Sequence, residues 1–158
     1  MKKHSVSVIL NNIRSSHNVG SMFRTADALG INKIYLVGYT PAPKDKFNRE
    51  NNEISKVALG GEKTVAWESV REIFPLISDL KKNGNQIVSV EQNEKAVDYK
   101  DFKIIQPTVF IFGNEVEGVE GDVLDESDKI IEIPMRGEKE SLNVSVAFGI
   151  ALARILDL

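Results

Sequence analysis

The sequence contains no cysteine and only two histidines, His4 and His17, which are far apart. Without cysteine there are no disulfides, thiolate metal sites or cysteine nucleophiles. Two distant histidines give no zinc-binding pattern, so we expect no metal. No apolar run approaches the ~20 residues of a membrane-spanning helix, and the apolar segment behind the basic residues 2–3 is too short for a signal peptide. We therefore expect a cytoplasmic protein that does not enter a membrane.

Several common nucleotide-binding and catalytic signatures are also missing. The sequence has neither a P-loop nor a G-x-G-x-x-G turn, which are the usual phosphate cradles. It has no G-x-S-x-G nucleophile elbow, and His17 has no obvious serine partner. The pattern therefore gives no support to a P-loop NTPase, a dinucleotide-dependent enzyme or a serine hydrolase.

The composition fits one globular domain. The chain has 158 residues, of which 42% are hydrophobic and 27% are charged, and this is enough for a substantial core. The net charge is −3, but residues 1–79 carry 11 Lys+Arg against 8 Asp+Glu, whereas residues 80–158 carry 9 against 15. A nucleic-acid surface should therefore use the first half, with Arg136 and Lys139 as additions. A merely solvated charge pattern agrees equally well with these numbers.

Predicted strands alternate with predicted helices along the chain. Apolar runs bounded by turn residues predict strands at residues 5–10, 33–37, 64–67, 86–90, 108–112 and 129–133. Periodic segments predict helices at residues 19–29, 54–59, 69–82, 119–125 and 142–156, with Pro75 bending or interrupting the third of them. The β-loop-α-β order of the first forty residues indicates a parallel pair joined by a crossover. The sequence thus predicts a three-layer α/β fold, with a mostly parallel sheet and helices on both faces.

The first candidate functional stretch lies between the first strand and the first helix. We expect Asn18 to cap this helix, and Gly20 allows another backbone to approach closely. Arg24 follows six residues later, less than two turns on, so both polar side chains can border the same end of the helix. The alternative for Arg24 is a surface salt bridge with an acid such as Asp27.

The second stretch is Gly113-Asn114-Glu115 with Gly118. It directly follows the run at residues 108–112, which is nearly all apolar, as is typical of a strand covered on both faces. Glu115 therefore emerges at the carboxyl end of a buried strand, where open α/β sheets place their sites. The alternatives are a turn with solvated acids and, for Glu115, a structural hydrogen bond to a neighbouring loop.

The third stretch joins the strand at 129–133 to the helix at 142–156 through Pro134 and a polar loop. We expect Ser141 to cap this helix and Asn143 to lie in its first turn, beside the positive end of the helix dipole. An ordinary βα connection, with Asn143 as a capping amide, is the alternative. The helix is apolar almost all round, so it is either sunk in the fold or faces a second subunit.

In this order and spacing, the three stretches resemble the three motifs of the SpoU (TrmH-type) RNA 2′-O-ribose methyltransferases, in the SPOUT superfamily. The resemblance extends over residues 6–155. The matching residues are Asn18, Gly20 and Arg24, then Gly113, Asn114, Glu115 and Gly118, then Ile133, Pro134, Met135, Ser141, Leu142, Asn143, Val144 and Ser145. The resemblance implies S-adenosylmethionine bound in a C-terminal trefoil knot, and a homodimer. The sequence shows no internal repeat and no linker, so we expect a single methyltransferase domain over residues 1–158, with no separate RNA-binding domain.

The same resemblance implies a set of site residues. Those expected to hold the cofactor are Val90, Gly113, Ile133, Met135, Ser141 and Leu142. Those expected to form the catalytic group are Asn18, Arg24, Glu115, Ser141 and Asn143. Candidate contacts to the RNA are His17, Arg24, Lys44, Lys46, Arg49 and Lys56.

Methyl transfer to a ribose hydroxyl is an in-line displacement, which a protein assists by alignment and by excluding water. The base proposed for the family is the arginine, here Arg24, yet a guanidinium keeps its proton at ordinary pH. Arg24 is therefore also interpreted as a bidentate clamp on the phosphate beside the target ribose. Without a separate RNA-binding domain a compact substrate is favoured, so we expect tRNA over rRNA. The alternatives are a non-catalytic RNA- or nucleotide-binding module that kept the fold, and methylation of another acceptor.

Overall fold

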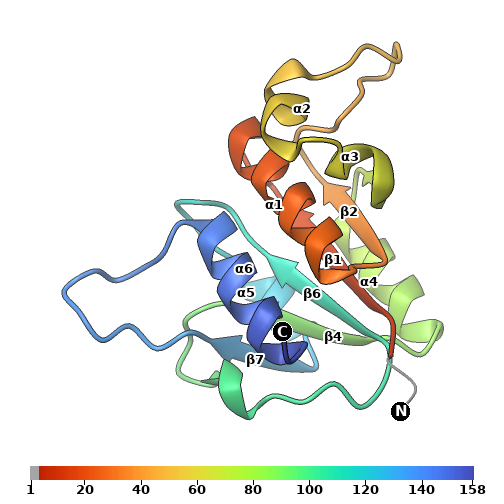
Figure 1. Ribbon diagram of the computed structural model, residues 1–158. Helices are drawn as coiled ribbons and strands as arrows, with labels where there is room; N and C mark the ends of the chain where they lie inside the picture. The colour runs from red at the N-terminus through yellow and green to blue at the C-terminus, as the bar shows by residue number, and fades with distance from the viewer. Residues whose placement is uncertain (1–3) are drawn as a thin grey trace.

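The computed structural model describes residues 4–158, and a single seven-stranded sheet forms its centre (Figure 1). The strands lie in the order β3-β2-β1-β6-β4-β7-β5, and every neighbouring pair is parallel. Their bounds are β1 Val6–Asn11, β2 Lys33–Val37, β3 Ala66–Val70, β4 Gln86–Val90, β5 Val97–Asp98, β6 Thr108–Phe112 and β7 Lys129–Glu132. Residues 1–3, part of the segment judged too short for a signal peptide, lie outside the described residues.

β1 and β6 form the middle of the sheet and are almost completely buried. All five residues of β6 are buried, and Val8 of β1 pairs with Ile34 on one side and Phe110 on the other. Water does not reach these backbone groups, so the parallel ladder satisfies them while branched and aromatic side chains cover both faces. The strand predicted at residues 108–112 is confirmed.

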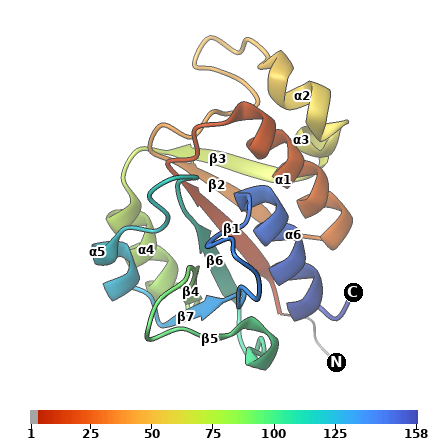
Figure 2. The ribbon, with the colours of Figure 1, turned by 90° about the vertical axis from the view of Figure 1, so that its left-hand side faces the viewer.

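Helices cover both faces of the sheet, which confirms the predicted three-layer fold (Figure 2). α1, α2, α3 and α6 lie over one face, where Phe112 packs against Phe148 with 5.0 Å between ring centroids. α4 and α5 lie over the other face, where Ile77 and Val123 join Ile111 in a second apolar cluster. The helices are α1 Ser16–Leu29, α2 Asn52–Ala58, α3 Gly61–Thr64, α4 Ile73–Lys82, α5 Gly121–Asp125, α6 Val144–Ile155 and the 3-10 helix η1 Tyr99–Asp101. Within residues 4–158, no helix is long and apolar enough to cross a membrane.

α1 begins three residues before its predicted start. Its cap is Ser15, whose hydroxyl accepts the Asn18 N–H at 3.1 Å, so the capping role predicted for Asn18 is wrong. Serine and asparagine cap helices about equally well, and here the loop places Ser15 opposite the free N–H groups. The predicted end is confirmed, because Gly30 has the left-handed φ of 70° that favours glycine.

α6 begins two residues after its predicted start. Its cap is Asn143, whose Oδ1 accepts the N–H groups of Ser145 and Val146. The capping role predicted for Ser141 is therefore wrong, because the chain is not yet helical at residues 141–143. The alternative of Asn143 as a capping amide is confirmed.

The helix predicted at residues 69–82 is shorter in the structure. β3 takes up Ser69 and Val70, and α4 begins only at Ile73. Pro75 is the third residue of α4, where a backbone N–H has no partner inside the helix, so the proline does not interrupt it. The strand predicted at residues 64–67 therefore begins and ends too early, because β3 is Ala66–Val70. α3, β5 and η1 are too short to give a periodic signal, and the sequence does not predict them.

All seven strands run in the same direction, so their carboxyl ends meet at one edge of the sheet. The loops that follow β1, β2, β4, β6 and β7 leave from this edge. They include all three stretches that the sequence singles out. Open α/β sheets bind their ligands at this kind of edge.

Candidate functional site

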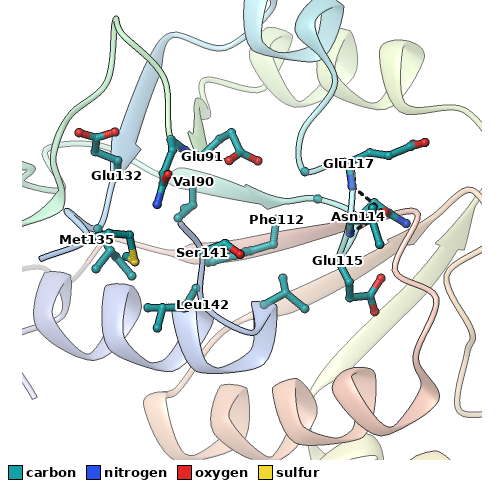
Figure 3. A pocket seen from close by; sticks show the side chains of 17 residues that line it. Val90, Glu91, Phe112, Asn114, Glu115, Glu117, Glu132, Met135, Ser141 and Leu142 are labelled. Atoms are coloured by element: carbon teal, nitrogen blue, oxygen red, sulfur yellow. Dashed lines mark hydrogen bonds between the residues drawn. The ribbon is translucent and has the colours of Figure 1, made fainter. Parts of the chain in front are cut away.

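A cleft of about 190 Å³ lies at the carboxyl ends of β4, β6 and β7 (Figure 3). Its walls come from three segments that are far apart in sequence. The lining residues are Val90, Glu91, Gln92, Phe112, Gly113, Asn114, Glu115, Val116, Glu117, Gly118, Glu132, Ile133, Met135, Ser141, Leu142, Val144 and Ala147. All six residues predicted to hold the cofactor are among them, namely Val90, Gly113, Ile133, Met135, Ser141 and Leu142.

The cleft also contains acidic residues that the sequence analysis does not single out. Glu91, Glu117 and Glu132 line it together with Glu115, whereas no lysine, arginine or histidine of the described chain does. The charged residues that line the cleft are therefore all acidic, which favours a positively charged ligand. In the sequence, the feature that could have identified Glu91 and Glu132 as site residues is their position at the carboxyl end of a predicted strand. In the described part of the chain, no group of three or more His, Asp or Glu residues is placed to hold a metal ion.

The loop after β6 is a tight turn that requires glycine at position 113. A Cβ on Gly113 would lie 2.3 Å from the carbonyl carbon and oxygen of Gly118. Asn114 and Gly118 exchange two backbone hydrogen bonds, of 3.1 and 2.9 Å, and Gly118 has a φ of 69°. The Oδ1 atom of Asn114 accepts the N–H groups of Val116 and Glu117, as the dashed lines in Figure 3 show. The turn therefore packs its backbone tightly against itself at the wall of the cleft.

Glu91 connects this turn to the end of β4. Its Oε2 accepts the Val119 N–H at 2.8 Å, and its Oε1 accepts the Gln92 N–H at the same distance. Its carboxylate also fills the space beside Gly118, where a Cβ would lie only 2.1 Å from it. One side chain thus joins two of the cleft's three walls.

Glu115 connects the turn to the start of α1. Its carboxylate accepts the backbone N–H groups of Arg14 and Ser15, each at 3.0 Å, and the Nδ2 group of Asn18 at 3.1 Å. The Oδ1 atom of Asn18 in turn accepts Asn143 Nδ2 at 3.2 Å. A chain of hydrogen bonds therefore runs from the loop after β6, through the buried Asn18, to the cap of α6. The structural hydrogen bond considered for Glu115 is confirmed.

The sequence profile of the SpoU rRNA methylase family matches residues 5–153. The chain belongs to the SpoU rRNA methylase family. This confirms the family that the three stretches resemble. The chain is 34% identical, over 152 residues, to the tRNA (guanosine(18)-2′-O)-methyltransferase of Aquifex aeolicus, covering 96% of this chain and 68% of that protein.

Further SpoU-type relatives agree with this assignment. The chain is 33% identical to the 23S rRNA (guanosine-2′-O-)-methyltransferase RlmB of Neisseria meningitidis serogroup B, covering 92% of this chain and 56% of that protein. The crystal structure of an AdoMet-bound rRNA methyltransferase from Sinorhizobium meliloti is similar with a TM-score of 0.85 and 26% identity, over 98% of this chain and 56% of that one. The chain thus spans little more than half the length of these two proteins.

In this SpoU-family chain, Arg24 lies away from the cleft. Six positions separate it from Asn18, which turns the two side chains about 120° apart around α1. Asn18 is buried whereas Arg24 is exposed, so one chain alone does not bring them to the same site. Arg24 forms no ion pair within residues 4–158, and the salt bridge considered with Asp27 is absent there. Asp27 instead accepts the hydroxyl of Thr64.

The other residues predicted to contact RNA in this SpoU-family chain are all exposed. They are His17, Lys44, Lys46, Arg49 and Lys56. Arg49 forms an ion pair with Asp45, with 2.7 Å between Nε and Oδ2. Their exposure leaves them accessible to a large ligand, and their role as RNA contacts stays a prediction.

The charge of Glu115 should stabilise the fold at neutral pH. Burial raises the pKa of this carboxyl, but hydrogen bonds from the N–H groups of Arg14 and Ser15, from its own backbone N–H and from the Asn18 amide lower it by more. The pKa therefore lies below its ordinary value of 4.5. A lowered pKa stabilises the fold above the unfolded-state pKa, and this is lost as the pH falls through the folded-state pKa. We expect Glu115→Gln to lower the free energy of unfolding by about 1 kcal/mol at neutral pH. Urea unfolding over a pH series should show the difference shrinking below about pH 4.

Glu117→Gln is the matched control for this experiment. Glu117 lines the same cleft, but its carboxylate accepts no hydrogen bond from any residue between 4 and 158. It should therefore unfold like the wild type at every pH. A deficit in Glu115→Gln that stayed the same in acid would show that its charge is not what holds the start of α1.

Proposed function

We propose that this chain is an S-adenosylmethionine-dependent methyltransferase that methylates a ribose 2′-hydroxyl of RNA, with tRNA favoured over rRNA. The observation that carries the proposal is the convergence of three stretches, distant in sequence, on one cleft and one hydrogen-bonded network. The Aquifex relative is named for a tRNA substrate and the Neisseria relative for 23S rRNA. A tRNA offers a compact shape that suits the exposed basic residues of this chain. A cytoplasmic location belongs to the same proposal.

The residues of the cleft fit S-adenosylmethionine. Val90, Ile133, Met135 and Leu142 offer apolar surface to an adenine ring. The turn at Gly113 presents backbone groups to the polar edges of the ligand. Four glutamates without a cation suit a ligand that carries sulfonium and ammonium charges. When bound, the cofactor supplies an electrophilic methyl group.

The chain's own residues then align the substrate and exclude water. The network of Glu115, Asn18 and Asn143 holds three loops in one arrangement, which keeps the reacting groups in line. The guanidinium of Arg24 keeps its proton, so Arg24 clamps the phosphate beside the target ribose rather than acting as a base. The proton of the hydroxyl leaves to water or to another acceptor. Ser141, on the cleft wall, contributes a hydroxyl next to the cofactor.

We propose in addition that the chain acts as a homodimer with α6 at the interface. Val146 and Ile150 are 48% and 40% exposed and lie one turn apart on α6, so they form an apolar stripe along this helix. A stripe of this kind favours burial against another molecule. Arg24 does not line the cleft of its own chain. We propose that the homodimer brings Arg24 of the partner subunit to the cleft.

The C-terminal trefoil knot belongs to the same proposal. β4 lies between β6 and β7 in the sheet, and the chain returns from β7 along the cleft to α6, which packs over β6. On this course the segment between β7 and α6 passes the loops that follow β4 and β6. A C-terminal segment must take such a course to thread through an earlier loop and form a knot.

Isothermal titration calorimetry tests the cofactor, and labelled methyl transfer tests the reaction. We expect S-adenosylmethionine to bind the purified chain, and ATP to bind at least about tenfold more weakly because the acidic cleft repels its phosphates. Incubation of unfractionated tRNA and rRNA with labelled cofactor should give ribose methylation, which nuclease mapping locates.

The two measurements separate the possible outcomes. If the folded chain does not bind S-adenosylmethionine, the proposal is contradicted. A chain that binds the cofactor and RNA but transfers no methyl group is instead a non-catalytic RNA-binding module. If methylation is found on a base and not on ribose, the proposed cofactor stands, and the proposed acceptor is wrong.

A further inference from the structure

The loop between β2 and α2 presents an exposed phenylalanine beside two cations. Phe47 is 66% exposed, although a large apolar side chain is normally more stable when buried. Lys46 Nζ and Arg49 Cζ each lie 5.1 Å from the centroid of its ring, within the range of a cation–π interaction. None of the three residues lines the cleft. The ring therefore belongs to a surface feature outside the site described above.

Asp45 holds this loop in one shape. Its Oδ1 accepts the N–H groups of Phe47 and Arg49 at 2.8 and 3.0 Å, and its Oδ2 accepts Arg49 Nε at 2.7 Å. Backbone hydrogen bonds join Asp45 to Arg49 and to Asn48, which adopts a left-handed φ of 62°. The backbone that carries the ring is thus held in place before a partner arrives, which lowers the entropy cost of binding to this loop.

The loop leaves the sheet at the same edge as the cleft, and Figure 1 shows it projecting from the body of the molecule between β2 and α2. At the far end of the loop, Asn51 Nδ2 donates to Ser16 Oγ at 3.2 Å. Ser16 follows Ser15, whose N–H is bound by Glu115 of the cleft wall. A ligand that extends from the cleft along this edge therefore passes the base of the loop that carries Phe47.

We infer that Phe47 is a stacking platform for an unpaired base of the RNA substrate, and that Lys46 and Arg49 bind the phosphates beside that base. This inference rests on the proposed function and adds a binding site to it. Stacking on an aromatic ring tolerates any base, because every base has a π-face. A base that moves onto the ring displaces one cation from the ring toward its own phosphate. The platform therefore selects a single-stranded segment, because the bases of a continuous duplex are already stacked.

An apolar protein partner fits this surface poorly. The residues around the ring in the loop are charged and exposed, namely Lys44, Asp45, Lys46, Arg49 and Glu50. The cores of protein–protein interfaces are depleted of charged residues. An isolated ring among cations matches the combination of stacking and electrostatics by which proteins hold single-stranded nucleic acid.

Phe47→Leu tests the inference, since it keeps an apolar side chain and removes the π-face. We expect it to raise the Kd of the RNA, measured by fluorescence anisotropy, and the KM of methylation about tenfold. The kcat should not change, because the contact is the same in the ground state and the transition state. The slope of log Kd against log salt should stay at the wild-type value, whereas Lys46→Gln should reduce it by about 0.7. Phe47→Trp should retain wild-type affinity.

Phe74→Leu is the matched control. Phe74 is 41% exposed on α4, over the opposite face of the sheet, and its replacement should leave RNA binding unchanged. If the wild type methylates RNA and Phe47→Leu does so with an unchanged KM, the inference is overturned and the proposed function stands. If the wild type neither binds nor methylates tRNA or rRNA, the proposed function fails, and the inference fails with it. If Phe47→Leu instead weakens self-association in sedimentation velocity, the ring belongs to a subunit interface and the inference is overturned.

Discussion

Arg24→Ala should lower the kcat of RNA methylation by about 10²-fold or more, while the Kd of S-adenosylmethionine changes less than about twofold. The loss follows from the proposed clamp, because a phosphate that is no longer held lets the ribose hydroxyl drift out of line with the methyl group. Cofactor binding should persist, since Arg24 is exposed on α1 and does not line the cleft of its own chain. Single-turnover kinetics with mapped RNA, together with calorimetry, measures both quantities.

Arg71→Ala is the control for the loss of an exposed arginine. The Arg71 side chain is 95% exposed and lies just after β3, with only a 3.8 Å contact to Glu72. Its replacement should leave kcat unchanged. Arg24→Lys should recover part of the activity, because it restores the charge but not the bidentate fork. Normal turnover by Arg24→Ala would remove this residue from the site altogether.

A mixed dimer shows which subunit supplies Arg24. Two single variants are mixed so that their subunits exchange. One is Arg24→Ala, and the other is Met135→Trp, which is chosen to fill the cleft with a larger side chain. Each variant alone should be inactive. If Arg24 acts across the interface, the mixture should recover about a quarter of wild-type activity, because about half of the dimers are mixed and each holds one working site. A mixture that stays inactive although mixed dimers form would place Arg24 and the cleft in the same subunit.

The sequence predicts the architecture well because the sheet leaves a strong local signal. The run at residues 108–112 is apolar on both faces, and the structure buries all of it. The glycines at 30 and 113 mark a helix end and a tight turn, which depend on backbone conformation and space rather than on distant partners. The loops at the carboxyl ends of the strands therefore fall where the sequence places them.

The start of α1 is set by a contact that no local pattern contains. Ser15 and Asn18 have similar capping ability, and the choice falls on Ser15 because Glu115, a hundred residues away, binds its backbone N–H. The cleft glutamates escape prediction for a related reason. Glu91 looks like an ordinary polar residue after a strand, and only the fold shows that it binds the Val119 N–H across the cleft.

The largest stability effect is expected from Gly113→Ala. The added Cβ would lie 2.3 Å from the carbonyl group of Gly118 and 2.5 Å from the Val119 nitrogen. These are backbone atoms, so they cannot rotate away, and Glu91 holds that same Val119 N–H. We expect the free energy of unfolding to fall by about 3 kcal/mol and the melting temperature by about 6–12 °C. The Kd of S-adenosylmethionine, measured by calorimetry below the transition, should rise at least about tenfold because the displaced turn is a wall of the cleft.

Gly121→Ala separates this steric effect from the general effect of losing a glycine. Gly121 is the first residue of α5, and an added Cβ meets no atom within 4 Å. Alanine there removes freedom from the unfolded chain, so the variant should match the wild type or gain up to about 1 kcal/mol. If Gly113→Ala unfolds like Gly121→Ala, the turn after β6 is looser than its contacts indicate. If Gly113→Ala is destabilised as expected but binds S-adenosylmethionine normally, the turn contributes to the fold and not to the cofactor site, and the backbone contacts proposed for Gly113 must come from another wall of the cleft.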